Sequence, residues 1–122
     1  MIIGITGTLG AGKGTVVDYL KSKGFKHYAV SDTFLVSEAK KRGLEPVREV
    51  RQMIANEYRS QVPTKLMEAV YALALDDIHA GHSVVIEPQH TVAEVEFVRS
   101  KGGIVFAVDA YIEIRYGRIR GR

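Results

Sequence analysis

Residues 1–20 read MIIGITGTLG AGKGTVVDYL, and this stretch decides the fold. The apolar run Ile2–Ile5 is typical of a strand buried on both faces of a parallel sheet. A glycine-rich segment follows directly. From about Lys13 to Ser22 the apolar residues, among them Val17 and Leu20, recur at helical spacing. The stretch therefore predicts a strand, a tight turn and a helix in direct succession.

The glycine-rich segment contains the G-x-x-x-x-G-K core of the phosphate-binding loop. Glycines let successive backbone N–H groups point at phosphate oxygens, and the N-terminal end of the following helix adds a partial positive charge. The lysine is long enough to reach the terminal phosphates, which makes it a predicted catalytic residue. We therefore predict that nine residues bind ATP: Gly7, Thr8, Leu9, Gly10, Ala11, Gly12, Lys13, Gly14 and Thr15.

The rest of the chain alternates between strand and helix patterns. Apolar runs predict strands at Val84–Ile86 and Ile104–Val108, and a weaker one at His27–Val30. Four helices are predicted: one capped by Ser31-Asp32-Thr33 and reaching about Arg42, one with Pro46 in its first turn, one over Thr64–Ala80, and one from a Thr91/Glu94 capping box to Gly102. This alternation predicts an α/β P-loop sandwich, with a parallel sheet of about four strands flanked by helices, and places ligands at the carboxyl ends of the strands.

Length and composition indicate one domain, residues 1–122. The chain is 46% hydrophobic and 25% charged, as in ordinary globular proteins. It has no cysteine, which excludes disulfides and thiolate metal sites and suits a reducing cytoplasm. The longest apolar run, Ala69 to Leu75, is far shorter than the roughly 18 residues that cross a bilayer. We therefore expect a cytoplasmic protein with no membrane partner.

The net charge of +3 is concentrated in the last eight residues, which contain four arginines. Without those four, 13 of the 17 basic residues remain against 14 acidic ones, so the body of the chain is balanced. A nucleic-acid-binding domain has a broad basic face instead. We therefore expect small-molecule partners, a nucleotide and a phosphate acceptor, and no nucleic acid.

One position of the loop departs from the general motif. Gly14 follows Lys13, where a Ser or Thr hydroxyl normally binds magnesium, and the hydroxyl comes one residue later at Thr15. This Gly-Lys-Gly-Thr form resembles the loop of adenylate kinase and related nucleoside monophosphate kinases. The resemblance implies transfer of the γ-phosphoryl group of ATP to a nucleoside or deoxynucleoside monophosphate. It also implies Mg²⁺ held largely through water.

Three further segments are similar to that family. Val30-Ser31-Asp32-Thr33 resembles the segment that opens its acceptor site, which implies an acceptor-binding role for Asp32. Val84–Glu87 resembles a third strand ending in an acid near the magnesium-bound waters. Glu87 is therefore expected to bind the acceptor and, with Thr15, to hold Mg²⁺ through water. The run 118–122 resembles the family's arginine-rich segment, and this implies catalytic arginines at two positions, of which the first also covers the adenine: Arg118 and Arg122.

The acceptor site departs from the family pattern. Leu35 and Val36 stand where an arginine is usual, and no arginine follows Glu87. Arg48 and Arg51, on the helix after Pro46, share one helix face and are predicted to clamp the acceptor phosphate instead. The acceptor would then be framed by helices within residues 32–80.

The chain reaches only Arg122, whereas the kinases that it resembles continue into a lid, a last helix and a fifth strand. It is therefore expected to be a fragment or a reduced member lacking those elements. Thr91–Arg122 also resembles dephospho-CoA kinases, so a dephospho-CoA or other small-metabolite kinase stays an alternative. An ATP-binding module without transfer activity is another. Sheet edges left without a fifth strand make a homodimer an expectation.

Overall fold

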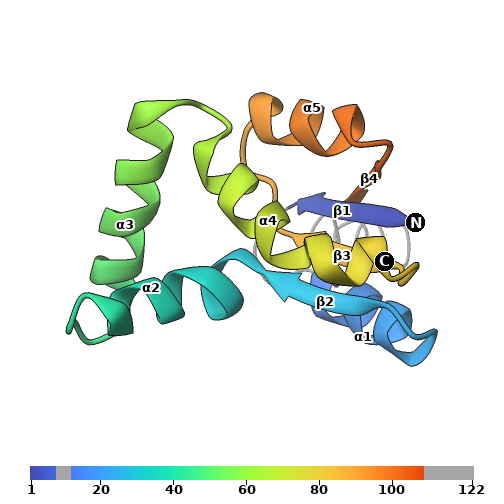
Figure 1. Ribbon diagram of the computed structural model, residues 1–122, viewed down its shortest axis with the longest axis horizontal. Helices are drawn as coiled ribbons and strands as arrows, with labels where there is room; N and C mark the ends of the chain where they lie inside the picture. Colours follow the sequence, from blue (N-terminus) through green and yellow to red (C-terminus); the bar gives the residue numbers. More distant parts are fainter. Residues whose placement is uncertain (8–11, 109–122) are drawn as a thin grey trace, which may run out of the picture.

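Four parallel strands form the sheet of this protein. The computed structural model describes residues 1–7 and 12–108 (Figure 1). The strand order is β2-β3-β1-β4, and each neighbouring pair is parallel. The bounds are β1 Ile2–Gly7, β2 Lys26–Ala29, β3 Val84–Glu87 and β4 Ile104–Val108. The predicted α/β architecture with a parallel four-stranded sheet is confirmed.

Helices cover both faces of the sheet. Helix α1 packs on one face, whereas α4 and α5 pack on the other. Helix α3 stands beyond the carboxyl ends of the strands (Figure 1). The helical bounds are α1 Lys13–Ser22, the π-helical η1 Val30–Leu35, α2 Val36–Lys41, α3 Arg48–Gln61, α4 Lys65–His79 and α5 Val92–Ser100. No helix in the described ranges is long and apolar enough to cross a membrane.

Two hydrophobic clusters hold these layers together. The smaller cluster lies between the sheet and α1 and is made of Ile3, Ile5, Val17, Leu20 and Val85. The larger cluster fills the opposite face and reaches out to α2 and α3 through buried residues such as Ala39 and Ile54. Val84 and Ile86 point into it, while Val85 between them points to α1. β3 is therefore buried on both faces, as its continuous apolar run predicts.

Strand β4 differs from this pattern. Its apolar run predicts burial on both faces, but Ile104 is 51% exposed and Phe106 is 49% exposed. These residues pair with Ile3 and Ile5 of β1 and so lie on the α1 face of the sheet. There α1 covers the central strands, and nothing else in the described part of the chain covers β4. The prediction of two-sided burial is wrong for β4.

Two predicted helix starts are also wrong. The chain turns helical at Val30, so Asp32 lies inside η1 and does not cap a helix. The hydroxyl of Thr33 instead accepts the backbone N–H of Ala29 at the end of β2, at 2.9 Å. Helix α3 begins at Arg48, so Pro46 precedes the helix rather than lying in its first turn. In both places the adjoining strand or loop determines where the helix begins.

Candidate functional site

The predicted phosphate-binding loop connects β1 to α1. Its two flanking glycines adopt backbone conformations that other residues rarely adopt: Gly7 has φ 144° and Gly12 has φ 71°. A Cβ atom on Gly7 would lie 1.7 Å from the carbonyl oxygen of Val108, because the ends of β1 and β4 approach closely there. The two glycines are thus required by backbone geometry at each end of the loop. Six predicted site residues lie outside the described residues: Thr8, Leu9, Gly10, Ala11, Arg118 and Arg122.

Lys13 is the first residue of α1 and is only 9% exposed. No carboxylate among the described residues forms an ion pair with it. A buried ammonium group without an acidic partner is unfavourable unless an anion binds beside it. The position of Lys13 therefore suits a bound phosphate.

Lys13 borders a cavity of about 500 Å³ beyond the carboxyl ends of the strands. Among the described residues that line it, four side chains are cationic and none is Asp or Glu. The cavity is therefore electropositive and suits a ligand that carries several negative charges. Within residues 1–7 and 12–108, its lining residues are Lys13, Val30, Ser31, Leu35, Arg48, Arg51, Gln52, Ala55, Arg59, Pro88 and His90.

Helix α3 supplies three of these cations from one face. Arg48, Arg51, Ala55 and Arg59 follow one another at intervals of three or four residues, and all four line the cavity. Arg51 donates from Nη1 to the hydroxyl of Ser31, and its Nε is buried without a partner in the described structure. The structure therefore brings the predicted arginines Arg48 and Arg51 together with Lys13.

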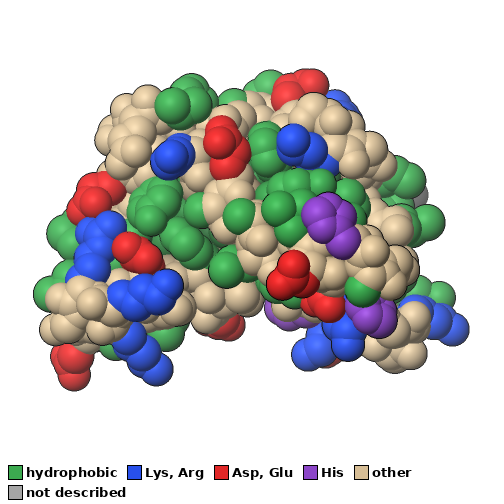
Figure 2. All heavy atoms as spheres, in the orientation of Figure 1, with side chains coloured by type: hydrophobic (Ala, Val, Ile, Leu, Met, Phe, Trp, Pro, Cys, Tyr) green, Lys and Arg blue, Asp and Glu red, His purple; other side chains and the backbone are tan. Residues whose placement is uncertain are grey.

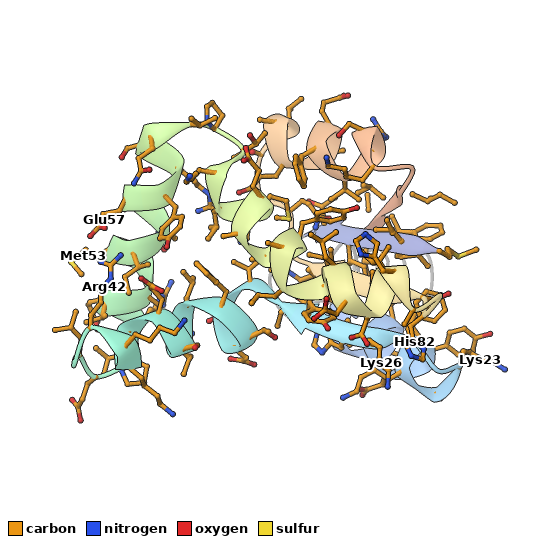
Figure 3. The ribbon with its side chains drawn as sticks, in the orientation of Figure 1. Lys23, Lys26, Arg42, Met53, Glu57 and His82 are labelled. Atoms are coloured by element: carbon orange, nitrogen blue, oxygen red, sulfur yellow. The ribbon has the colours of Figure 1, made fainter. Side chains whose placement is uncertain are left out.

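The position of α3 is set from its other side. Arg42, at the end of α2, binds both carboxylate oxygens of Glu57, at 3.0 and 3.1 Å, and its Nε lies 3.4 Å from Glu38. Figure 3 shows Arg42, Met53 and Glu57 along the same side of α3. This ion pair lies outside the cavity and connects α3 to α2, so it stabilises the helix that carries the arginines.

Sequence reasoning missed Arg59 as a site residue. The signal was available in the spacing, because Arg59 continues the face of Arg51 through Ala55 at steps of four residues. What the spacing does not show is the partner of Arg59: its Nε donates to Oε2 of Glu94 at 3.0 Å, across 35 residues of sequence.

Glu94 is fully buried, and both of its carboxylate oxygens are bound. Oε1 accepts the backbone N–H of His90 at 2.8 Å, and Oε2 accepts from Arg59. The backbone N–H of Glu94 donates to the hydroxyl of Thr91, which confirms Thr91 as the N-cap of α5. The Glu94 side chain reaches His90 rather than the N-cap residue, so only half of the predicted capping box forms. Glu94 thus connects α3, α5 and the segment after β3.

The imidazole of His90 also borders the cavity. Desolvation of the ring, followed by the positive charge of Arg59, lowers the pKa of His90 from its ordinary value of 6.5, while Glu94 opposes the shift. The folded protein therefore favours the neutral ring. A neutral imidazole among cations adds no further charge and keeps a lone pair for a hydrogen bond.

A pH-dependence of stability follows from this shift. The unfolded chain protonates His90 below about pH 6.5, whereas the folded chain resists protonation. The neutral ring therefore stabilises the fold fully above pH 6.5. This stabilisation is lost as the pH falls towards the lower pKa that His90 has in the folded protein. We expect wild type to lose more stability between pH 7.5 and pH 5 than His90→Gln does, as measured by urea unfolding. His79→Gln, at the end of α4 and not among the residues that line the cavity, is the control, and equal slopes for all three proteins would contradict the expectation.

Other predicted acceptor and metal residues lie outside the cavity. Asp32 is exposed on η1, and its neighbour Ser31 lines the cavity instead. Glu87 is half-buried at the end of β3, and its Oε2 lies 2.8 Å from Nε2 of His27, close enough to accept an N–H of the ring. Thr15 is exposed in the first turn of α1. Their predicted roles stay predictions.

Glu87 and Thr15 nevertheless fit a water-mediated Mg²⁺ site. β3 lies beside β1, the strand that leads into the loop, so the carboxylate of Glu87 is on the strand next to the loop. No group of three or more His, Cys, Asp or Glu side chains suited to a metal occurs within residues 1–7 and 12–108. Mg²⁺ usually keeps several waters and takes only one or two carboxylates together with phosphate oxygens.

A second basic surface lies far from the cavity. Lys and Arg side chains and histidines gather at the end of the molecule opposite α3 (Figure 2). Lys23, Lys26 and His82 are found there, where α1 ends and where β2 and β3 begin (Figure 3). This surface is at the amino ends of the strands, so it takes no part in the site at their carboxyl ends.

Two curated proteins are similar to this chain over almost its whole length. The chain is 30% identical to a UPF0200 protein of Pyrobaculum aerophilum and 28% identical to one of Methanothrix thermoacetophila, with 99% of the chain aligned in both cases. The aligned region is 66% and 65% of those proteins, so the chain spans slightly less than two thirds of the length of these curated relatives.

A family description covers almost the whole chain. Residues 3–122 match the family described as an AAA domain. The matched residues include the loop, nearly all of the sheet and the residues that line the cavity. The sheet order, the glycine-flanked loop and the buried lysine are all features of P-loop nucleotide-binding folds. The chain therefore belongs to the AAA domain family and is a P-loop NTPase-like protein.

Proposed function

We propose that this protein is an ATP-dependent phosphotransferase that moves the γ-phosphoryl group of ATP to the phosphate of a nucleoside or deoxynucleoside monophosphate. The observation that carries this proposal is the cavity in which Lys13, at the start of α1, faces Arg48 and Arg51 of α3. One wall belongs to the nucleotide loop and the other belongs to a different element. Such a cavity can hold a donor phosphate and an acceptor phosphate next to each other. The proposal treats residues 1–122 as one nucleotide-binding, kinase-like domain that acts on small molecules.

The donor side is built around the loop. Backbone amides of residues 7–15 and the ammonium group of Lys13 would hold the ATP phosphates, helped by the positive end of α1. Thr15 and Glu87 would hold Mg²⁺ through water. When bound, Mg²⁺ neutralises charge on the phosphate oxygens. Arg118 and Arg122 would stabilise charge on the transferring group by analogy with the kinases that the chain resembles.

The charge of the acceptor side favours a phosphate acceptor. A phosphate oxygen is already ionised at neutral pH, so it can attack without a general base, and the protein needs only to position it and offset its charge. The guanidinium groups of Arg48 and Arg51 supply that charge. A hydroxyl acceptor would need a proton acceptor, and no carboxylate lines the cavity within the described residues.

A second candidate is a kinase that phosphorylates a hydroxyl group, such as a dephospho-CoA or other small-metabolite kinase. The lowered pKa of His90 favours it, because a neutral imidazole bordering the cavity can accept a proton. The two candidates differ in their dependence on that ring. Transfer to a hydroxyl should fall strongly in His90→Gln, whereas transfer to a phosphate should change little.

Product analysis tests the proposal. Mg-ATP is incubated with a panel of ribo- and deoxynucleoside monophosphates and with dephospho-CoA, and ADP and phosphorylated products are separated by chromatography. We expect one ATP to be consumed for each monophosphate converted to its diphosphate, so that AMP would give two ADP, and we expect Lys13→Ala to be inactive. Conversion of dephospho-CoA alone would replace the proposal with the hydroxyl-acceptor candidate. ATP binding without acceptor-dependent ADP would identify a nucleotide-binding module instead.

A further inference from the structure

Resting on the proposed function, we propose that Arg59 is a further ligand of the acceptor phosphate and that the buried carboxylate of Glu94 positions it. The acceptor group recognised in this way is a phosphomonoester, which carries close to two negative charges at neutral pH. Arg59 would be a binding residue, because it borders the cavity. Glu94 would be a positioning residue, because it is fully buried and acts only through its neighbours.

The hydrogen bonding of Arg59 leaves its outer edge available. Only Nε donates to Glu94, at 3.0 Å, and the side chain keeps 22% of its surface exposed. Its two terminal nitrogens make no hydrogen bond within residues 1–7 and 12–108. A guanidinium group held by Nε can offer its terminal N–H groups to phosphate oxygens in a fixed, planar arrangement. Arg59 thus has both an anchor and a free binding edge.

Arg42 offers a comparison for Arg59, because its contacts are those of a structural arginine. Its Nη1 binds Glu57 and its Nε binds Glu38, so that carboxylates occupy two sides of the guanidinium group, away from the cavity. Arg59 has one carboxylate partner and borders the cavity instead. The contrast favours a ligand-binding role for Arg59 over a purely structural ion pair.

The hydrogen bonds and the burial of Glu94 exclude a direct role in ligand binding. Its oxygens accept from Arg59 and from the backbone of His90, and its own backbone N–H is bound by Thr91. With both oxygens occupied and the side chain fully buried, Glu94 cannot contact a ligand. It instead fixes two bordering residues, Arg59 and His90, relative to each other and to the start of α5.

The charges of the cavity agree with a dianionic ligand. Glu94 offsets the charge of Arg59, while neither Arg51 nor Lys13 forms an ion pair in the described structure. Arg51 also has a buried Nε without a partner. Two uncompensated charges thus remain near the oriented guanidinium group of Arg59, and Arg48 adds a further cation at the exposed rim.

Two conservative variants and one matched control test the inference. Arg59→Lys keeps a cation beside Glu94 but loses the terminal N–H groups. Glu94→Gln keeps an acceptor for His90 but places an amide N–H₂ or a neutral oxygen against Arg59. Arg42→Lys changes an ion-paired arginine outside the cavity. Circular dichroism and thermal melting establish that each variant is folded.

Calorimetric titration measures binding apart from turnover. The probes are the four ribonucleoside 5′-monophosphates, with adenosine as a phosphate-free control, added after a non-hydrolysable ATP analogue has saturated the donor site. We expect Arg59→Lys and Glu94→Gln each to weaken monophosphate binding about tenfold or more, since a charged hydrogen bond is lost. In these two variants the affinities for adenosine and for the ATP analogue should stay unchanged. Arg42→Lys should bind the monophosphates as wild type does. In turnover assays KM for the acceptor should rise while KM for ATP does not.

The outcomes separate this inference from the proposed function. Folded Arg59→Lys that binds the monophosphates as well as wild type does would overturn it, as would a wild type that binds none of them. Equal weakening of ATP and monophosphate binding in Glu94→Gln would make Glu94 merely structural. Arg59-dependent binding without any phosphoryl transfer would support the phosphate site and refute only the kinase activity.

Discussion

Lys13→Ala should lower kcat/KM for phosphoryl transfer by about 10²–10³-fold, the cost of removing one preorganised charge from a site where charge develops. Lys13 is nine-tenths buried at the start of α1 and borders the cavity, so water screens its charge poorly. The loss should appear mainly in kcat and in the affinity for ATP. The affinity for the acceptor, which depends on α3, should change much less. Initial rates of ADP formation at varied ATP and varied acceptor measure each parameter.

The control for this variant lies directly after the same helix. Lys23 is exposed at the C-terminal end of α1, where its ammonium group lies 5.4 Å from the ring of Tyr19. Lys23→Ala removes the same number of charges from α1 but is distant from the cavity, and it should leave kinetics within a factor of two. A folded Lys13→Ala protein with unchanged ATP affinity and turnover would refute the role of Lys13.

The fold was predictable where neighbouring residues in sequence decide the structure. Helix α1 has the bounds Lys13–Ser22 that the spacing of apolar residues predicts. Continuous apolar runs located β1, β3 and β4, and the weaker pattern at residues 27–30 located β2. Parallel strands joined by helices have few possible arrangements, so element order alone carries most of the topology.

The exposure of β4 could not be predicted in the same way. An apolar run indicates that a strand has two apolar faces, but burial depends on which helices cover those faces. Ile104 and Phe106 lie beside the buried residues Ile3 and Ile5, yet the buried cluster under α1 takes its strand residues from β1 and β3. Sequence periodicity contains no information on how far a helix extends across a sheet.

The candidate site was likewise predictable where its residues are close in sequence and unpredictable where they are distant. The loop and Lys13 come from contiguous residues, and Arg48 and Arg51 come from one helix, so their association is visible in the sequence. Arg59 and Glu94 are 35 residues apart in sequence. They meet only because α4 and β3 bring the start of α5 back to α3. Ser31 replaces the predicted Asp32 in the cavity because η1 begins earlier than the cap pattern indicates.

Two of the positions at which the sequence departs from the kinase pattern border the same cavity as the arginines of α3. Leu35, where an arginine was expected, is buried and contributes an apolar part of the cavity wall, as does Pro88 after β3. Arg48, Arg51 and Arg59 of α3 supply positive charge to the same cavity. This positive charge is consistent with the phosphate ligand that we propose.

Glu94→Ala should lower the free energy of unfolding by about 3–5 kcal/mol, the usual cost of breaking a buried ion pair by removing one partner. Three effects add here: Arg59 keeps its charge without a partner, the backbone N–H of His90 loses its acceptor, and a void opens at the start of α5. Urea unfolding measures the change, with Glu96→Ala as control. Glu96 pairs with Arg99 at 3.7 Å on the exposed side of α5, a contact worth at most about 1 kcal/mol. If Glu94→Ala cost no more than Glu96→Ala, Glu94 would not hold Arg59, and the preset guanidinium group in the cavity would lose its physical basis.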